Sequence, residues 1–264
     1  MTSWQNQYGP WALITGASAG LGAEFARQIA QKGLNVVLVA RRKDRLNALS
    51  QKLVQTHHLH TRIIVEDLTS AGACERVAQA VSDLEIGLLI NNAGFGLSGF
   101  YHELSPERLT QMTVLNCVVP VLLTNQFLPL MQQRKKGGIV FFASTASYQP
   151  CPTFAVYGAT KTFNLMLGEA LYREYKDQGI DILALSPGYT HTEFASVANI
   201  AQAGTFRQAS AQDVVRHGLK ALGKKGSAIH GWFNFLFTFC VRFLPRKLVT
   251  NITYKALKSR ISLK

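Results

Sequence analysis

The sequence reads Thr15-Gly16-Ala17-Ser18-Ala19-Gly20-Leu21-Gly22 between an apolar segment, Trp11–Thr15, and an amphipathic one, Leu21–Gln31. A glycine-rich turn between a strand and a helix lets the backbone approach a phosphate, and the helix N-terminus adds N–H groups and positive potential. The spacing is GxxxGxG instead of the commoner GxGxxG, and a turn without a ligand can have the same composition. Its place directly after the first strand is the context that a dinucleotide site requires. We therefore predict that this turn binds a pyrophosphate.

Short apolar runs and longer amphipathic stretches alternate over the first two-thirds of the chain. Most of the apolar runs lack polar alternates, as expected for parallel strands that are covered on both faces. We predict strands at Trp11–Thr15, Asn35–Ala40, Thr61–Val65, Gly87–Ile90, Gly138–Ala143, Asp181–Ser186 and Ser227–His230, and helices at Leu21–Gln31, Arg45–Thr56, Ala71–Ser82, Pro106–Gln133 and Ala159–Lys176. This alternation predicts an α/β fold with a doubly wound parallel sheet.

The composition is that of one folded domain, with 264 residues of which 47% are hydrophobic and 16% charged. We predict a main domain over residues 1–231 and a C-terminal extension over residues 232–264. The four cysteines lie far apart and have neither CxxC nor zinc spacing, so we expect free thiols in a reducing compartment and no metal site. The N-terminus lacks the basic start and the apolar run of a signal peptide, so we expect a cytoplasmic protein.

Cations follow the expected second strand, which ends at Ala40 and continues into Arg41, Arg42 and Lys43. In dinucleotide-binding folds an acidic residue near this point binds the ribose 2′-hydroxyl of NAD, whereas arginine accommodates the 2′-phosphate of NADP. A solvated helix start would also carry cations, but the lack of an acid here favours the phosphate. We predict that Arg41 and Arg42 select NADP(H), with NAD(H) as the alternative cofactor.

Four further segments complete a pattern. They are Asn91-Asn92-Ala93-Gly94, Asn116, Ser144 with Tyr157-Gly158-Ala159-Thr160-Lys161, and Pro187-Gly188-Tyr189-Thr190-His191-Thr192. Together with the glycine turn they resemble the classical short-chain dehydrogenase/reductase (SDR) family over roughly residues 10–195, in order and at family-like spacings. The resemblance implies one Rossmann-type domain with a parallel sheet of seven strands, assembled as a homodimer or homotetramer.

The resemblance also implies cofactor contacts, position by position. The residues are Thr15, Gly16, Ser18, Gly20, Leu21 and Gly22 at the pyrophosphate turn, Asp67 and Leu68 beside the adenine, Asn91, Ala93 and Gly94 against the adenosine ribose, and Pro187, Gly188, Thr190 and Thr192 at the nicotinamide. Tyr157 and Lys161 would border the nicotinamide as well, because in the family this lysine reaches the nicotinamide ribose.

Tyr157 and Lys161 are four residues apart on one predicted helix and therefore share a face. Free tyrosine has a pKa of about 10, and a neighbouring ammonium together with the positive nicotinamide ring is expected to lower it. Tyr157 would donate a proton to a carbonyl oxygen in reduction and take one from an alcohol in oxidation. The resemblance adds Ser144, which would hold the substrate oxygen, and Asn116, which would hold a water that links the lysine to solvent. A tyrosine and a lysine often share a helix face by chance, but the motifs in order favour a catalytic tetrad.

The net charge of +13 is concentrated near the C-terminus. Residues 1–213 contain 17 Lys/Arg and 15 Asp/Glu, whereas residues 214–264 contain 11 Lys/Arg and no acid. A helix over residues 232–244 would be apolar except for one stripe of Asn234, Thr238 and Arg242, and it is too short to span a bilayer. It must be buried over the substrate pocket, against another subunit, or in a membrane interface with the cations facing anionic headgroups. A nucleic-acid partner is not expected, because large apolar residues separate the cations.

These features predict an NADP(H)-dependent carbonyl reductase or alcohol dehydrogenase in the cytoplasm. Peripheral contact with the inner face of an anionic membrane is one of the three alternatives for its tail. The aromatic tail favours a small hydrophobic carbonyl or alcohol substrate. The alternative is a regulatory SDR-like protein that binds the cofactor without catalysis. Such proteins usually lose the tyrosine or the lysine, and both are present here. Enzymes of this fold that epimerise or dehydrate are generally longer and begin with a GxxGxxG turn, which disfavours them.

Overall fold

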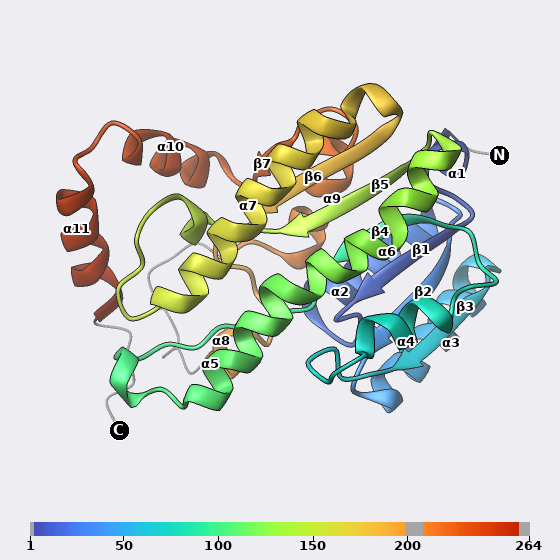
Figure 1. Cartoon of the computed structure of the whole chain (residues 1–264), viewed down its shortest axis with the longest axis horizontal. Helices are drawn as coiled ribbons and strands as arrows, with labels where there is room; N and C mark the ends of the chain where they lie inside the picture. Colours follow the sequence, from blue (N-terminus) through green and yellow to red (C-terminus); the bar gives the residue numbers. More distant parts are fainter. Residues whose placement is uncertain (1–2, 199–207, 259–264) are drawn as a thin grey trace.

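A computed structural model describes residues 3–198 and 208–258 of the chain (Figure 1). Its centre is one sheet of seven parallel strands in the order β3-β2-β1-β4-β5-β6-β7. The strands are β1 (Trp11–Thr15), β2 (Asn35–Ala40), β3 (Thr61–Val65), β4 (Ile86–Asn91), β5 (Gly137–Phe142), β6 (Ile180–Ser186) and β7 (Ser227–Ile229). The strand order reverses between β1 and β4, and ligands bind outside the carboxyl ends of such strands. The predicted doubly wound α/β fold with seven strands is confirmed.

Helices cover both faces of this sheet. One face is covered by α2 (Gly20–Gln31), α3 (Lys43–His57) and α9 (Ala211–Ala221), and the other by α4 (Ala73–Gln79), α6 (Val119–Arg134) and α7 (Ala155–Tyr175). Each face has its own apolar cluster, around Phe25 and Ile29 on the first and around Phe127 and Met131 on the second. Burial on both sides explains why the strand segments have no polar alternates. The remaining helices before the tail are α1 (Ser3–Tyr8), α5 (Pro106–Thr113) and α8 (Phe194–Val197).

The helix predicted over Pro106–Gln133 is interrupted. A π-helical turn, Val114–Val118, separates α5 from α6. Pro120 has no N–H to donate to the carbonyl of Asn116 four residues earlier, and that carbonyl instead accepts a hydrogen bond from Asn164 Nδ2 of α7 at 2.7 Å. The inserted residue of the π turn and the proline together turn Asn116 toward α7. Turns of this kind are frequent at functional sites.

Thr15 ties β1 to the loop that follows β4. Its buried hydroxyl donates to the carbonyl of Ile90 at 3.1 Å and accepts from the N–H groups of Asn92 and Ala93 at 3.0 and 2.9 Å. One side chain therefore holds together the two strands at which the sheet order reverses.

We expect Thr15→Val to lower the free energy of unfolding by about 2 kcal/mol, because the isosteric side chain leaves the N–H of Ala93 without its partner. The N–H of Asn92 and the carbonyl of Ile90 keep their bond to each other at 2.9 Å. Denaturant unfolding followed by circular dichroism measures the change. Thr110→Val is the matched control, since its exposed hydroxyl only bonds the carbonyl of Pro106 in its own helix at 2.9 Å. Equal losses in the two variants would contradict the role given to Thr15.

The C-terminal extension forms two helices, α10 (Trp232–Val241) and α11 (Arg246–Lys258), at one margin of the molecule (Figure 1). Residues 259–264 of the predicted extension lie outside the described part. Within residues 3–198 and 208–258, one segment is long and apolar enough to cross a membrane by length and composition, Pro106–Arg134. Leu123, Phe127 and Met131 of this segment are buried against the sheet, as in a core helix.

Candidate active site

The glycine turn has the backbone geometry of a phosphate cradle. Gly16 and Gly20 have φ angles of 67° and 54°, in the left-handed region that favours glycine. A Cβ on Gly22 would collide with the carbonyl oxygen of Gly16, so glycine is required for α2 to begin this close to β1. The first turn of α2 contains no acidic residue, which leaves its N–H groups and the positive end of its dipole for an anion.

An arginine cluster lies beside this turn. The guanidinium of Arg42 donates two hydrogen bonds to Ser18 Oγ, at 3.1 and 3.0 Å, and so joins the end of β2 to the glycine turn. Arg42 and Arg45 both form ion pairs with Glu193, and all three side chains are about half exposed. Ser18, Arg42 and Arg45 thus present hydrogen-bond donors and positive charge together, which is what recognition of a phosphate needs.

The residues expected beside the adenine follow β3. Asp67 accepts hydrogen bonds from the backbone and the side chain of Thr69, at 3.0 and 2.7 Å, and pairs with Arg41 at 3.6 Å. Leu68 is buried in the core. Arg41 is therefore engaged by Asp67, whereas Arg42 reaches the glycine turn.

The end of β4 braces the glycine turn through Asn92. Its Nδ2 donates to the carbonyl of Thr15 at 2.8 Å. The buried side chain of Asn91 donates to Thr124 Oγ1 of α6 at 3.3 Å, and its contact with the cofactor stays a prediction. Ala93 bonds Thr15 through its backbone N–H. The side chain that supports the cradle is thus the second asparagine of the pair.

Ser144, Tyr157 and Lys161 meet beyond the carboxyl end of β5. Ser144 has an extended backbone and caps a 3-10 turn, Thr145–Tyr148, with its hydroxyl accepting from the N–H of Ala146 at 3.1 Å. Tyr157 and Lys161 lie one turn apart near the start of α7. The Ser144 hydroxyl lies close enough to Tyr157 to lower the pKa of its phenol, and the Lys161 ammonium lies 5.8 Å from the centre of the Tyr157 ring.

Burial raises the pKa of Tyr157 above its ordinary value, and the nearby Ser144 hydroxyl offsets only part of this rise. The lowering expected from the ammonium together with the nicotinamide ring stays a prediction for the enzyme with its cofactor. In the chain alone, Lys161 Nζ donates to the carbonyl of Phe142 at 3.0 Å. Burial also lowers the pKa of Lys161 to about 8. Near neutral pH Tyr157 is therefore a protonated phenol, the form that donates a proton.

Asn116 fixes the loop after β4 against α7. Its Nδ2 donates to the carbonyl of Phe95 and to Thr160 Oγ1, both at 3.0 Å, and its Oδ1 accepts from the N–H of Phe95 at 3.2 Å. A Cβ on Gly94 would lie 2.8 Å from Asn116 Oδ1 and 3.7 Å from Lys161 Nζ, so the glycine keeps a narrow space open beside the lysine. The role of Asn116 in holding a water stays a prediction.

The segment after β6 connects the catalytic turn to the glycine turn. The N–H of Thr145 donates to the carbonyl of Pro187 at 3.1 Å, and a Cβ on Gly20 would lie 3.2 Å from the methyl group of Thr192. Between these two points Thr190 Oγ1 donates to the carbonyl of Gly188 at 3.1 Å. The segment Pro187–Thr192, which contains the four residues assigned to the nicotinamide, thus lies between the turn that follows Ser144 and the pyrophosphate cradle.

These residues fit a phosphate-bearing dinucleotide. The cradle of Gly16, Gly20 and Gly22 has no side chains in the way, the arginine cluster lies at one end, and Lys161 with the segment Pro187–Thr192 lies at the other. A nicotinamide dinucleotide would therefore extend from Arg42 to Tyr157.

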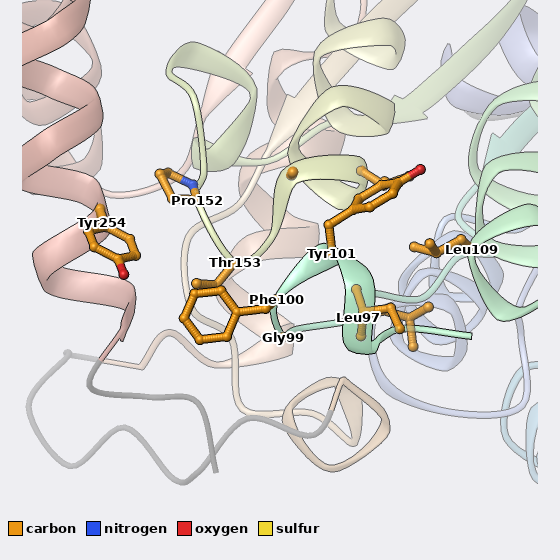
Figure 2. Close-up of a pocket in the computed structure, with 11 residues that line it drawn as sticks. Leu97, Gly99, Phe100, Tyr101, Leu109, Pro152, Thr153 and Tyr254 are labelled. Atoms are coloured by element: carbon orange, nitrogen blue, oxygen red, sulfur yellow. The ribbon is translucent and has the colours of Figure 1, made fainter. Parts of the chain in front are cut away.

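An apolar cavity lies beside the segment that leads into α7 (Figure 2). Its walls are Leu97, Gly99, Phe100, Tyr101, Leu104, Leu109, Pro152, Thr153, Ala155, Val156 and Tyr254. Ala155 and Val156 directly precede Tyr157, and Figure 2 shows Tyr254 of α11 at the side of the group away from Leu109. On another side Phe194 of α8 covers the catalytic ring, with a centroid distance of 5.3 Å. The cavity has the apolar lining of a pocket for a hydrophobic ligand.

Sequence reasoning missed several residues of the site. They are Arg45, Asn92, Asn164, Glu193, Phe194 and Tyr254. Arg45 had a signal, because it lies three residues after Arg42 on the same helix face. Phe194 and Tyr254 had none, since their contacts are with segments distant in the sequence.

The two pKa shifts predict a pH profile. Lys161 loses its charge as the pH rises through about 8, while Tyr157 stays protonated. The ammonium stabilises the negative charge that Tyr157 acquires when it gives up its proton. We expect kcat/KM for ketone reduction to be level below pH 8 and to fall above it. In Lys161→Arg the side chain keeps its charge, so kcat/KM should no longer fall near pH 8. A fall of kcat/KM that persists near pH 8 in this variant would contradict its assignment to deprotonation of Lys161.

The comparisons with known proteins agree with this geometry. The sequence profile of the family described as short chain dehydrogenase matches residues 10–203. The chain is 31% identical to hydroxysteroid dehydrogenase-like protein 1 of Gallus gallus, over 82% of this chain and 66% of that protein. It is 29% identical to a very-long-chain 3-oxoacyl-CoA reductase of Mus musculus, over 96% and 82%, and 28% identical to the inactive hydroxysteroid dehydrogenase-like protein 1 of Homo sapiens, over 92% and 74%. The chain thus spans about two-thirds to four-fifths of the length of these relatives.

Two solved structures extend the likeness to the whole fold. One, from a study of 7beta-hydroxysteroid dehydrogenase stereoselectivity, has a TM-score of 0.89 at 25% identity and covers 96% of this chain and 99% of its own. The other is a short-chain dehydrogenase from Sphingobium yanoikuyae in complex with NADPH, with a TM-score of 0.80 at 30% identity over 89% and 94%. This chain belongs to the short-chain dehydrogenase/reductase family of oxidoreductases.

Proposed function

We propose that this protein is an NADP(H)-dependent oxidoreductase that interconverts a hydrophobic ketone or aldehyde and its alcohol through Tyr157, Lys161, Ser144 and Asn116. One arrangement carries the proposal. Ser144 lies close enough to Tyr157 to lower the pKa of its phenol, and the Lys161 ammonium lies 5.8 Å from the centre of the same ring, at the carboxyl edge of the sheet. Ala155 and Val156, which directly precede Tyr157, line an apolar cavity.

Each residue of the tetrad has a defined task in the reduction. Bound NADPH would supply the hydride to the carbonyl carbon. The hydroxyls of Ser144 and Tyr157 would hold the carbonyl oxygen, which takes the Tyr157 proton as the new C–H bond forms. The phenolate left behind is stabilised by the Lys161 ammonium and regains a proton from solvent past Lys161 and Asn116. Oxidation of the alcohol reverses these steps.

The preference for NADP(H) is supported by the arginine cluster. Arg42 bonds Ser18 at the glycine turn, and Arg45 adds a second guanidinium to the same place. A 2′-phosphate placed here would take over the interactions that Glu193 makes with both arginines. Arg41, which pairs with Asp67, adds a third guanidinium to the surface formed by Arg42 and Arg45.

We expect the purified protein to oxidise NADPH with lipophilic ketones at a higher kcat/KM than with small polar ones, and to prefer NADPH over NADH. The assay follows nicotinamide absorbance over a panel of carbonyl compounds graded by lipophilicity. Equal or better turnover with NADH would contradict the proposed cofactor, and better turnover of polar carbonyls would contradict the proposed substrate class. Tight NADPH binding without turnover of any carbonyl would favour the regulatory alternative.

A homodimer or homotetramer is part of this proposal. Exposed apolar side chains lie on the two neighbouring helices α6 and α7, among them Val121 and Leu122 on α6 and Phe163 and Met166 on α7. Helix faces of this kind are typical of subunit interfaces. We place the enzyme in the cytoplasm, where the four free thiols of the chain would stay reduced.

A further inference from the structure

α10 has its polar side turned inward and its apolar side turned outward. Thr238 is buried and donates to the carbonyls of Asn234 and Phe235, at 2.9 and 3.0 Å. Asn234 packs on Gly188, where a Cβ would collide with its amide. The outward side consists of large apolar residues that are between 39% and 68% exposed, namely Trp232, Phe233, Phe235, Leu236, Phe237 and Phe239. A helix that faces water has the reverse arrangement.

The same apolar surface continues into the next helix. Phe243 and Leu244 in the connecting turn and Leu248 and Ile252 on α11 are also exposed. The Phe239 ring contacts the Phe243 ring at a centroid distance of 5.2 Å. Because the exposed apolar residues follow one another along the chain from α10 through the turn into α11, at one margin of the molecule (Figure 1), they mark an interaction site and not scattered surface residues.

Cations surround this surface. The exposed ones on α10, the turn and α11 are Arg242, Arg246, Lys247, Lys255 and Lys258, and no acidic residue follows Asp213 in the sequence. A second copy placed here by two-fold symmetry would bring these cations against the same cations. An anionic lipid surface supplies the opposite charge, and its interface accommodates Trp and Phe rings.

We propose that the outer surface of α10, the turn and α11 binds peripherally to an anionic lipid bilayer. The aromatic side chains enter the interface and the cations lie on the headgroups. With ten residues α10 is too short to span the hydrocarbon core, so it lies in the plane of the interface.

This placement sets the catalytic centre beside the lipid. Tyr254 of the same α11 lines the cavity, and Asn234 of α10 touches Gly188 of the nicotinamide segment. This inference about the substrate rests on the proposed function: the substrate is a lipophilic ketone or alcohol that enters the cavity from the bilayer.

Co-sedimentation of the full-length protein with vesicles tests the docking, without substrate, so that its outcome is independent of hydride transfer. Vesicles of phosphatidylcholine alone are compared with vesicles that also contain phosphatidylglycerol, at low and high salt. Phe233→Ser/Phe243→Ser removes two exposed rings, and Arg246→Gln/Lys247→Gln removes two cations. The matched controls are Val54→Ser and Lys52→Gln on α3, an exposed apolar residue and an exposed cation far from the tail.

We expect binding to the vesicles with phosphatidylglycerol, weakened by salt. The aromatic double variant should bind about tenfold more weakly, each removed cation should cost about fivefold, and the controls should bind like the wild type. Unchanged binding in both double variants overturns the proposal. A smaller assembly of the aromatic variant in lipid-free buffer, with unchanged vesicle binding, identifies the surface as a subunit interface instead. A higher KM for a short water-soluble ketone with unchanged vesicle binding identifies it as a pocket lid.

Discussion

Tyr157→Phe is expected to lose nearly all hydride transfer while it keeps the fold and the cofactor site. The variant removes only the hydroxyl that gives the proton to the substrate oxygen, and general acid catalysis contributes about 10²–10⁴-fold to kcat. The ring remains and keeps its contacts with Phe154 and Phe194, at centroid distances of 6.1 and 5.3 Å. Steady-state kcat, NADPH binding by fluorescence titration and the Tm are the three measurements.

Tyr172→Phe is the matched control, because Tyr172 lies on the same helix but far along it from Ser144 and Lys161. Its kcat should stay close to that of the wild type. If Tyr157→Phe keeps its activity, Tyr157 has no part in the proton transfer and the proposed mechanism fails.

Arg42→Ala is expected to raise the KM for NADPH by about tenfold to a hundredfold, since a hydrogen bond to a charged group contributes about 1.5–3 kcal/mol. The KM for NADH should change little, because NADH has no 2′-phosphate. The ratio of kcat/KM for the two cofactors is therefore the quantity to measure. Raised salt should narrow this ratio in the wild type, as the cluster of Arg42, Arg45 and Glu193 is partly exposed.

Arg173→Ala controls for the loss of one surface arginine. Its guanidinium pairs with Asp177 at 2.9 Å near the C-terminal end of α7, away from the glycine turn. If Arg42→Ala lowers kcat/KM equally for NADPH and NADH, then Arg42 supports the glycine turn through Ser18 and does not bind the 2′-phosphate.

The strands were predictable because each is buried on both faces and therefore has a continuous apolar run. All seven appear within one or two residues of the predicted bounds. The interruption of the helix at Val114–Val118 was not predicted, because a π turn depends on hydrogen bonds to another helix, here from Asn164. The pKa of Tyr157 in the chain alone was also not predictable, since it is raised mainly by burial, which the fold decides.

In the C-terminal segment, too, the sequence predicts the type of element and the tertiary structure decides how it faces its neighbours. The sequence predicts an apolar helix with one polar stripe, but the direction of that stripe depends on the neighbours of the helix. The structure turns Thr238 inward and leaves the Phe side chains exposed.

The sequence by itself determined the fold class, the glycine turn and the order of the catalytic motifs, because all three depend on local periodicity and spacing. The tertiary structure decided which side chains meet. It placed the amide of Asn92 against the glycine turn, joined Arg45 and Glu193 to Arg42, and brought Tyr254 to the cavity. These contacts join segments that are far apart in the chain, so their spacing along the sequence does not predict them. They form only because the sheet brings the ends of these segments to the same edge.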